Sequence, residues 1–246
     1  MFGYNRLSIH DFSAPVQAIV ARSKFLARIT GNSFWGLNGL DRELVEIIGT
    51  SKGFFVELGA NNGLKQSNTK HLEQFHGWSG ILIEPFAGNF HLLAHNRSSR
   101  TSFVNAACVG PEYRNTTVEL LYADLMTTPI SEASDIVDQE GHAQSGEKFL
   151  ARGERVHKFS APALTLTQVL EQEKAPSQME LLSLDVEGIE LDVLKGLDHV
   201  KYRFSWVLVE SRSHAALFNY LESNGYRFHS KLSSHDYLFS SISFQH

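Results

Sequence analysis

Residues 54–63, FFVELGANNG, decide how this sequence is expected to fold. The first five of them, Phe54–Leu58, form a short apolar run of the kind that makes a buried β-strand. A glycine-containing turn follows, and a helix is expected from about Lys65 to His76. A strand, a tight turn and a helix in this order start an α/β unit, so we expect the same alternation further along the chain.

Strands and helices alternate after this first unit. Further β-strands are predicted at Ile81–Glu84, Thr101–Val109, Leu181–Asp185 and Trp206–Glu210. Helices are predicted at Phe90–Asn96, Leu166–Lys174, Ile189–Lys195 and Ala215–Ser223. Thr165 and Gln168 have the spacing of a capping box, and Gly196 is placed to end a helix. The tail, Tyr226 to Phe244, suits a closing antiparallel pair, so the pattern predicts a doubly wound, mostly parallel sheet.

The composition predicts one domain that does not bind nucleic acid. The 246 residues carry 22 Lys and Arg against 27 Asp and Glu, a net charge of −5, and a phosphate-binding surface needs a basic excess. With 42% hydrophobic residues, the chain can form one sizeable core, so residues 1–246 are expected to be a single domain. Residues 1–50 are expected to form an N-terminal helical cap. Residues 122–157 break the alternation and predict an insertion, either a lid or substrate segment or a solvated loop.

The cysteine content and the hydropathy of the sequence are both consistent with a cytoplasmic protein. The single cysteine, Cys108, cannot close an intramolecular disulfide. The N-terminal segment lacks the uninterrupted apolar stretch of a signal peptide, and no window reaches the roughly 18 apolar residues that a membrane helix needs. We therefore expect a cytoplasmic protein with no integral membrane segment; a homo-oligomer stays open.

Acidic residues stand at the ends of four predicted strands. In a doubly wound sheet, the ligand binds outside the carboxyl ends of the strands. Those ends carry Glu57, Glu84, Asp185 with Glu187, and Glu210. Such a gathering of carboxylates is costly unless a cation, a hydroxyl-rich ligand or backbone donors compensate for it.

The glycine turn Gly59–Gly63 fits neither of two phosphate-binding patterns. A dinucleotide fingerprint would place glycines at Asn61 and Leu64, and a P-loop would place its lysine directly after the second glycine. A nicotinamide-dependent oxidoreductase therefore remains only an alternative. S-adenosylmethionine has a ribose diol, no phosphate and a sulfonium cation, and it suits this acidic edge.

Three motifs in order resemble the FkbM family of S-adenosylmethionine-dependent methyltransferases. They are ELGANNG at 57–63, GWSGILIEP at 77–85 and SLDVEGIELDVLKG at 183–196, and the resemblance covers roughly residues 38–240. It implies a class I methyltransferase (Rossmann-like) fold with a seven-stranded sheet. It also implies O-methylation of a hydroxyl group on a small-molecule or saccharide acceptor, such as a sugar, polysaccharide or natural product. A cofactor-binding domain that has lost its chemistry is the other alternative.

The same motifs, the start of the helix after the glycine turn and the end of the strand predicted at 101–109 give the expected cofactor site. Its residues are Glu57, Gly59, Ala60, Asn61, Gly63, Ser67, Glu84, Pro85, Ala106 and Asp185. The glycine turn is expected to hold the methionine and ribose parts, and Glu84 to bind the ribose hydroxyls. Ser67 either reaches the methionine carboxylate or only begins the helix.

Catalysis is expected from Asp185, Glu187 and Glu210. Methyl transfer to an alcohol needs a group that removes the hydroxyl proton, and Asp185 is the first candidate for this base. The three carboxylates could instead hold Mg²⁺ or another divalent cation that lowers the pKa of a substrate diol. A third possibility is that they only orient the backbone or bind sugar hydroxyls.

Overall fold

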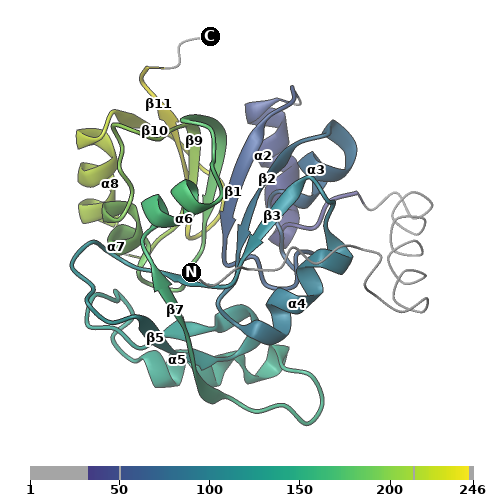
Figure 1. Cartoon of the computed structure of the whole chain (residues 1–246), viewed down its shortest axis with the longest axis vertical. Coiled ribbons are helices and arrows are strands. Elements are labelled where there is room, and N and C mark those ends of the chain that lie inside the picture. The colour runs from purple at the N-terminus through teal and green to yellow at the C-terminus, as the bar shows by residue number, and fades with distance from the viewer. Residues whose placement is uncertain (1–32, 50, 213, 244–246) are drawn as a thin grey trace.

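The structure, a computed structural model, describes residues 33–49, 51–212 and 214–243 (Figure 1). Most of the expected N-terminal cap, residues 1–32, lies outside this range. The described part of the cap forms a 3₁₀ turn, η2 (Leu37–Gly39), and a helix, α2 (Leu40–Ile48). Leu44 in α2 is fully buried, so this helix packs on the core. Within the described ranges, no helix has the length and apolar character needed to cross a membrane.

A seven-stranded sheet forms the centre of the protein, with the strand order β10-β11-β9-β8-β1-β2-β3. Its strands are β1 (Phe54–Leu58), β2 (Ser79–Ile83), β3 (Thr101–Val104), β8 (Gln178–Leu184), β9 (Arg203–Glu210), β10 (Tyr226–Lys231) and β11 (Asp236–Ser241). The five neighbouring strands β3, β2, β1, β8 and β9 pair in parallel. β11 pairs antiparallel with both β9 and β10. The predicted mostly parallel seven-stranded sheet, with a closing antiparallel pair, is confirmed.

Helices cover both faces of this sheet (Figure 1). They are α3 (Lys70–His76), α4 (Ala87–Asn96), α6 (Leu166–Gln172), α7 (Glu190–Lys195) and α8 (His214–Ser223). In β1, Val56 and Leu58 pack with α6, α7 and α8, whereas Phe55 packs on the other side with α2, α3 and α4. Successive strand residues point to opposite faces, so a mostly apolar run suits a sheet that is covered on both faces. The capping box at Thr165 is present, and Gly196 ends α7, as predicted.

A second, smaller sheet lies across the carboxyl edge of the main sheet (Figure 1). Its order is β4-β7-β5-β6, from β4 (Ala107–Cys108), β5 (Thr117–Tyr122), β6 (Thr128–Pro129) and β7 (His157–Leu164). The single strand expected at 101–109 is therefore wrong. The chain leaves the main sheet after Val104, where Asn105 Nδ2 donates to the carbonyl oxygens of Glu84 and Pro85 at 2.8 and 2.9 Å.

The insertion 122–157 contains more regular structure than its sequence indicated. It forms η3 (Asp124–Met126), β6, α5 (Gln139–Ser145) and η4 (Gly146–Phe149). Asp138 caps α5 by accepting a hydrogen bond from the Gly141 backbone N–H at 2.9 Å. Ala143 of α5 is fully buried against Leu121 of β5, which fixes the helix on the small sheet.

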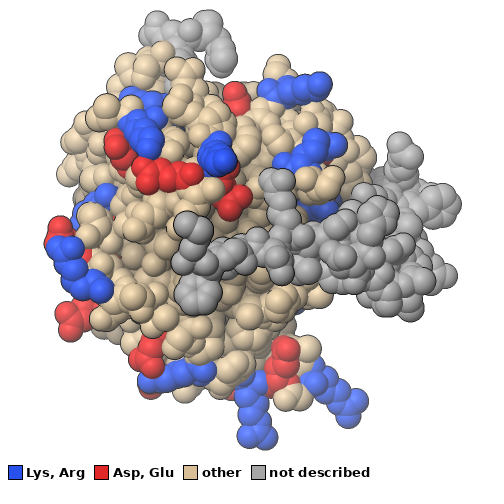
Figure 2. All heavy atoms as spheres, in the orientation of Figure 1, with Lys and Arg blue, Asp and Glu red and all other residues tan. Residues whose placement is uncertain are grey.

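On the face shown in Figure 2, acidic and basic side chains are intermixed.

Candidate functional site

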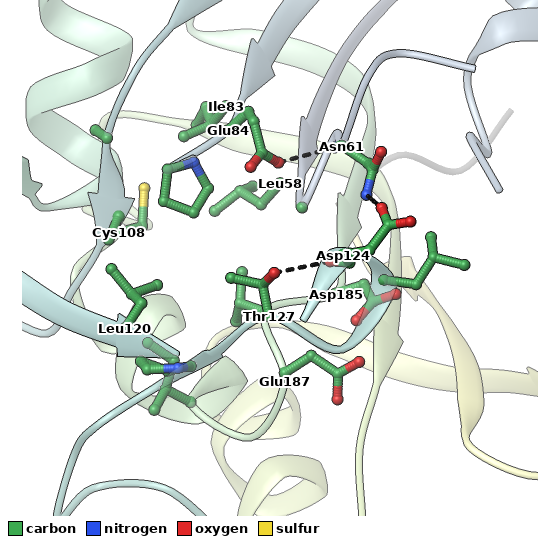
Figure 3. A pocket seen from close by; sticks show the side chains of 18 of the residues that line it. Leu58, Asn61, Ile83, Glu84, Cys108, Leu120, Asp124, Thr127, Asp185 and Glu187 are labelled. Carbon is green, nitrogen blue, oxygen red and sulfur yellow. Dashed lines mark hydrogen bonds between the residues drawn. The ribbon is translucent and has the colours of Figure 1, made fainter. Parts of the chain in front are cut away.

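A cavity lies where the carboxyl ends of β1, β2 and β8 meet the second sheet (Figure 3). The predicted site residues that line it are Gly59, Asn61, Glu84, Pro85, Ala106, Asp185 and Glu187. The second sheet and the insertion contribute Leu120, Asp124, Leu125, Thr127 and Pro129. The cavity therefore lies at the carboxyl edge where the sequence predicted the site, and the insertion forms one of its walls.

The glycine turn brings the ends of β1 and β8 into direct contact. Gly59 has φ +73°, and a Cβ added there would lie 2.0 Å from the Asp185 carbonyl oxygen. Only glycine fits this position, because it lacks a side chain and adopts positive φ freely. Asn61, also at positive φ (46°), donates its backbone N–H to Glu84 Oε2 at 2.8 Å. The turn thus joins β1 to both neighbouring strands.

Glu84 presents a nearly buried carboxyl group to the cavity (Figure 3). Its Oε1 accepts the Phe86 backbone N–H at 2.9 Å, and its Oε2 accepts that of Asn61. Burial raises the pKa of Glu84 to about 8, and the nearby charge of Asp124 adds to this effect. Each oxygen keeps further acceptor capacity, so the group can bind hydroxyls from the cavity.

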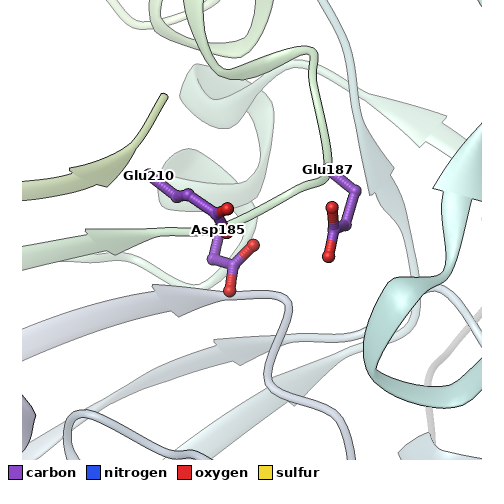
Figure 4. A group of neighbouring side chains, drawn as sticks. All are labelled: Asp185, Glu187 and Glu210. Atoms are coloured by element: carbon purple, nitrogen blue, oxygen red, sulfur yellow. The ribbon is translucent and has the colours of Figure 1, made fainter. Parts of the chain in front are cut away.

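Asp185, Glu187 and Glu210 form an acidic cluster beside the cavity (Figure 4). One oxygen atom from each carboxyl group lies within 4.8 Å of the others. Burial, followed by the charges of Glu210 and Glu187, raises the pKa of Asp185 well above its ordinary value. Burial also raises the pKa of Glu210, which is hydrogen-bonded to Asp185. Two carboxyl groups in such contact favour sharing one proton.

The sequence matches the family model of the methyltransferase FkbM domain over residues 57–228, well over half of the chain. The chain belongs to the FkbM methyltransferase family. It therefore carries an S-adenosylmethionine-dependent methyltransferase domain, as the three motifs predicted. This family membership rules against the nicotinamide-dependent oxidoreductase. The main sheet gives this FkbM methyltransferase the expected class I fold.

Three solved structures to which the chain is similar are distant from it in sequence. M. capricolum TrmK in complex with S-adenosyl-homocysteine is 11% identical with a TM-score of 0.42, over 81% of this chain and 65% of that chain. The human methyltransferase 10 domain containing protein is 11% identical with a TM-score of 0.48, over 98% and 100%. Precorrin-6y C5,15-methyltransferase from Geobacter metallireducens is 7% identical with a TM-score of 0.41, over 82% and 86%. A comparison with curated proteins finds no match.

Four predicted cofactor residues of this FkbM methyltransferase do not line the cavity. Glu57 lies beneath the turn, where Oε2 accepts from Ser67 Oγ at 3.0 Å and Thr69 Oγ1 at 2.5 Å. Ser67 is buried in the same network. Within the turn, Ala60 faces the core, and Gly63 lies against Arg97 and Leu93. These residues shape the turn from behind instead of forming the cavity wall.

The same network explains why α3 begins later than predicted. Glu57 Oε1 accepts the Asn68 backbone N–H at 2.9 Å, and residues 65–69 consequently form a turn. The helix starts at Lys70 instead of near Lys65. An acidic side chain thus takes the donors that would otherwise point toward a ligand.

Arg97 is a buried cation that sequence reasoning missed. Its Nε lies 3.0 Å from Glu73 Oε2, and its Nη1 lies 3.3 Å from Glu57 Oε2 and from the Gly63 carbonyl oxygen. Burial acts to raise the pKa of Glu73, but the charges of Arg97 and Lys70 outweigh it and lower that pKa. Arg97 therefore links the glycine turn to α3.

Two further partners of the acidic cluster also went unpredicted. Arg212 Nη2 lies 3.3 Å from Glu187 Oε2 and 3.4 Å from Glu210 Oε1. His142 of α5 places Nε2 at 2.8 Å from Glu187 Oε2. A divalent cation at this cluster would have to share both glutamates with the guanidinium, which already supplies positive charge.

Backbone strain is concentrated around the cavity. Within the described ranges, six non-glycine residues have positive φ, and four of these line the cavity: Asn61, Gln66, Asp124 and Glu187. Each such conformation costs on the order of 1–3 kcal/mol and persists where surrounding contacts enforce it, often at functional sites.

Proposed function

We propose that this FkbM methyltransferase transfers a methyl group from S-adenosylmethionine to a hydroxyl group of a sugar, a polysaccharide or a natural product. One observation carries the proposal: a single cavity joins an apolar end, the Glu84 carboxyl and the acidic cluster, in which the pKa values of Asp185 and Glu210 are raised. The expected cytoplasmic location and a homo-oligomeric state stay predictions.

The donor set supports S-adenosylmethionine as the occupant. Ala106, Cys108 and Leu120 give one end an apolar surface suited to an adenine ring. Glu84 retains acceptors for the two ribose hydroxyls. The carboxyl groups of Asp185 and Glu187 offer negative charge near a sulfonium.

When bound, S-adenosylmethionine would supply an electrophilic methyl group, whose bond to sulfur breaks to leave S-adenosylhomocysteine. Asp185 would accept the proton of the acceptor hydroxyl while the oxygen gains the methyl group. A base with a raised pKa is well matched to this task near neutral pH. The step requires the Asp185–Glu210 pair in its ionised form, and the pair then shares the transferred proton. Arg212 limits the negative charge on Glu187 and Glu210.

A labelled-methyl assay tests the proposal. The purified protein is incubated with methyl-labelled S-adenosylmethionine and a panel of glycans and hydroxylated natural products, with and without EDTA. We expect label in an ether linkage, identified by mass spectrometry. Transfer only to amines or carboxyl groups would contradict methylation of a hydroxyl group, and loss of transfer in EDTA would favour the divalent cation.

Thermal shift separates cofactor binding from turnover. We expect S-adenosylhomocysteine to stabilise the protein and NAD to leave its melting temperature unchanged. Binding of S-adenosylhomocysteine with no turnover on any acceptor would favour the non-catalytic alternative instead.

A further inference from the structure

Lys65 and Asp124 both line the cavity and form an ion pair. Asp124 lies at the end of the cavity away from Cys108 and Leu120 (Figure 3). Lys65 Nζ lies 2.5 Å from Asp124 Oδ2, and Asn61 Nδ2 donates to Asp124 Oδ1 at 2.8 Å. Lys65 follows the glycine turn, whereas Asp124 belongs to the insertion. The pair therefore bridges two parts of the cavity wall that are far apart in sequence.

The charges at this end are unusual for the cavity. Among the described residues that line it, Lys65 is the only basic one, and the others with charge are acidic. The Lys65 side chain is 48% exposed while that of Asp124 is 4% exposed. Lys65 can consequently swing to a ligand, whereas Asp124 is held in place.

The turn that carries Asp124 is fixed in a strained conformation. Asp124 has φ 53°, and Thr127 Oγ1 donates to its carbonyl oxygen at 2.8 Å. The Ala123 backbone N–H donates to the same Thr127 hydroxyl at 3.2 Å. A carboxylate held this firmly is preorganised to bind a cation, because little conformational entropy is lost on binding.

The layout of the cavity gives the cofactor one orientation. An adenine against Cys108 and Leu120 and a ribose at Glu84 leave the amino-acid end to extend toward Asn61 and Asp124. Lys65 is reached there as well, because it is paired with Asp124. That end carries one carboxylate and one ammonium group, and each needs a partner of opposite charge when water is displaced.

We propose that Lys65 and Asp124 form the subsite for the amino-acid end of S-adenosylmethionine. Lys65 Nζ binds the carboxylate, and the Asp124 carboxylate binds the ammonium group. This assignment rests on the proposed use of that cofactor.

Calorimetric titration with two ligands tests the subsite. S-adenosylhomocysteine carries the amino-acid end, and 5′-methylthioadenosine keeps the adenosine and thioether but lacks it. In Lys65→Met and Asp124→Asn, we expect the affinity for S-adenosylhomocysteine to fall by about tenfold or more, the usual scale of a charge-assisted contact. The affinity for 5′-methylthioadenosine should stay within about twofold, because this ligand lacks the group that the two residues contact. Its unchanged binding would also show that each variant is folded.

Lys201 and Glu171 supply a matched control. They form an ion pair of the same length, 2.5 Å, with both side chains 49% exposed and neither lining the cavity. Lys201→Met and Glu171→Gln should leave both affinities unchanged.

The outcomes separate this proposal from the cofactor assignment. An equal loss for both ligands in Lys65→Met and Asp124→Asn, or no loss for either, overturns the subsite. If the wild-type protein binds neither ligand, the proposed use of S-adenosylmethionine itself fails.

Discussion

His142 Nε2 lies 2.8 Å from Glu187 Oε2, although the two residues are 45 positions apart in the chain. His142 comes from α5 of the insertion, and Glu187 follows β8. Their side chains are only 12% and 11% exposed. The insertion therefore does more than cover the cavity, because it holds one member of the acidic cluster in place.

Replacing His142 with alanine should release Glu187 and disturb the geometry around the acceptor. We expect kcat to fall by about tenfold or more, since small displacements near reacting atoms are costly. The affinity for S-adenosylhomocysteine should change little. Steady-state kinetics and calorimetry measure the two quantities, and His229→Ala, an exposed histidine of β10, is the control. A parallel loss of affinity and kcat would contradict a role at the acceptor side.

Glu84→Ala should weaken cofactor binding more than turnover. Losing two hydrogen bonds to a ribose corresponds to roughly a 10- to 100-fold lower affinity. Because both ligands carry the ribose, 5′-methylthioadenosine and S-adenosylhomocysteine should be affected alike, unlike in the variants of Lys65 and Asp124. Calorimetry checks this, and a loss confined to S-adenosylhomocysteine would mean that Glu84 contacts the amino-acid end.

The raised pKa of Glu84 also predicts a pH dependence of stability. The folded protein keeps this proton up to a pKa of about 8, whereas the unfolded chain releases it near 4.5. The free energy of unfolding should therefore decrease as pH rises between these values. Asp185 and Glu190 contribute in the same direction, so the test is the difference between wild type and Glu84→Gln in urea unfolding at several pH values. The difference should change in favour of the variant as pH rises, and a constant difference would show that Glu84 does not hold a proton in the folded state.

Asp185→Asn should reduce kcat strongly, because it removes the proposed base. General-base catalysis contributes about 10²- to 10⁴-fold, which sets the expected loss. In the wild type, kcat should rise with pH through a pKa above that of an ordinary aspartate, since burial and Glu210 disfavour its ionisation. A pH profile of single-turnover rates tests both points. Unchanged turnover in Asp185→Asn would show that another group acts as the general base.

The sequence predicted which strand ends meet at the cavity better than it predicted how each side chain is held. Glu84 and Asp185 were found because parallel strands place their carboxyl ends at one edge, which needs no knowledge of distant contacts. Glu57 stands at the same edge, but its side chain turns beneath the loop toward Ser67 and Thr69. A strand pattern does not encode that choice, because it depends on donors that only the folded loop supplies.

Local sequence patterns also could not predict features that depend on contacts between distant parts of the chain. Arg97 and His142 reach the site through contacts that span 40 and 45 residues, and neither stands at a strand end. Asp124 lies in the insertion, whose composition resembled a loop. The division of the expected strand 101–109 depends on Asn105 capping the neighbouring loop, which is also a tertiary effect.

Arg97→Met should destabilise the protein, because it leaves the buried carboxyl groups of Glu57 and Glu73 without their shared counter-charge. Removing one partner of a buried ion pair costs about 3–5 kcal/mol. Urea unfolding measures this, and Arg114→Met is the control, since its ion pair with Glu112 is exposed and is worth about 0–1 kcal/mol. The wild-type advantage should shrink at low pH, because Glu73 has a lowered pKa and its stabilisation is lost only as pH falls below 4.5 through that pKa. Equal small losses in the two variants would mean that the network beneath the glycine turn is held by packing instead of by charge.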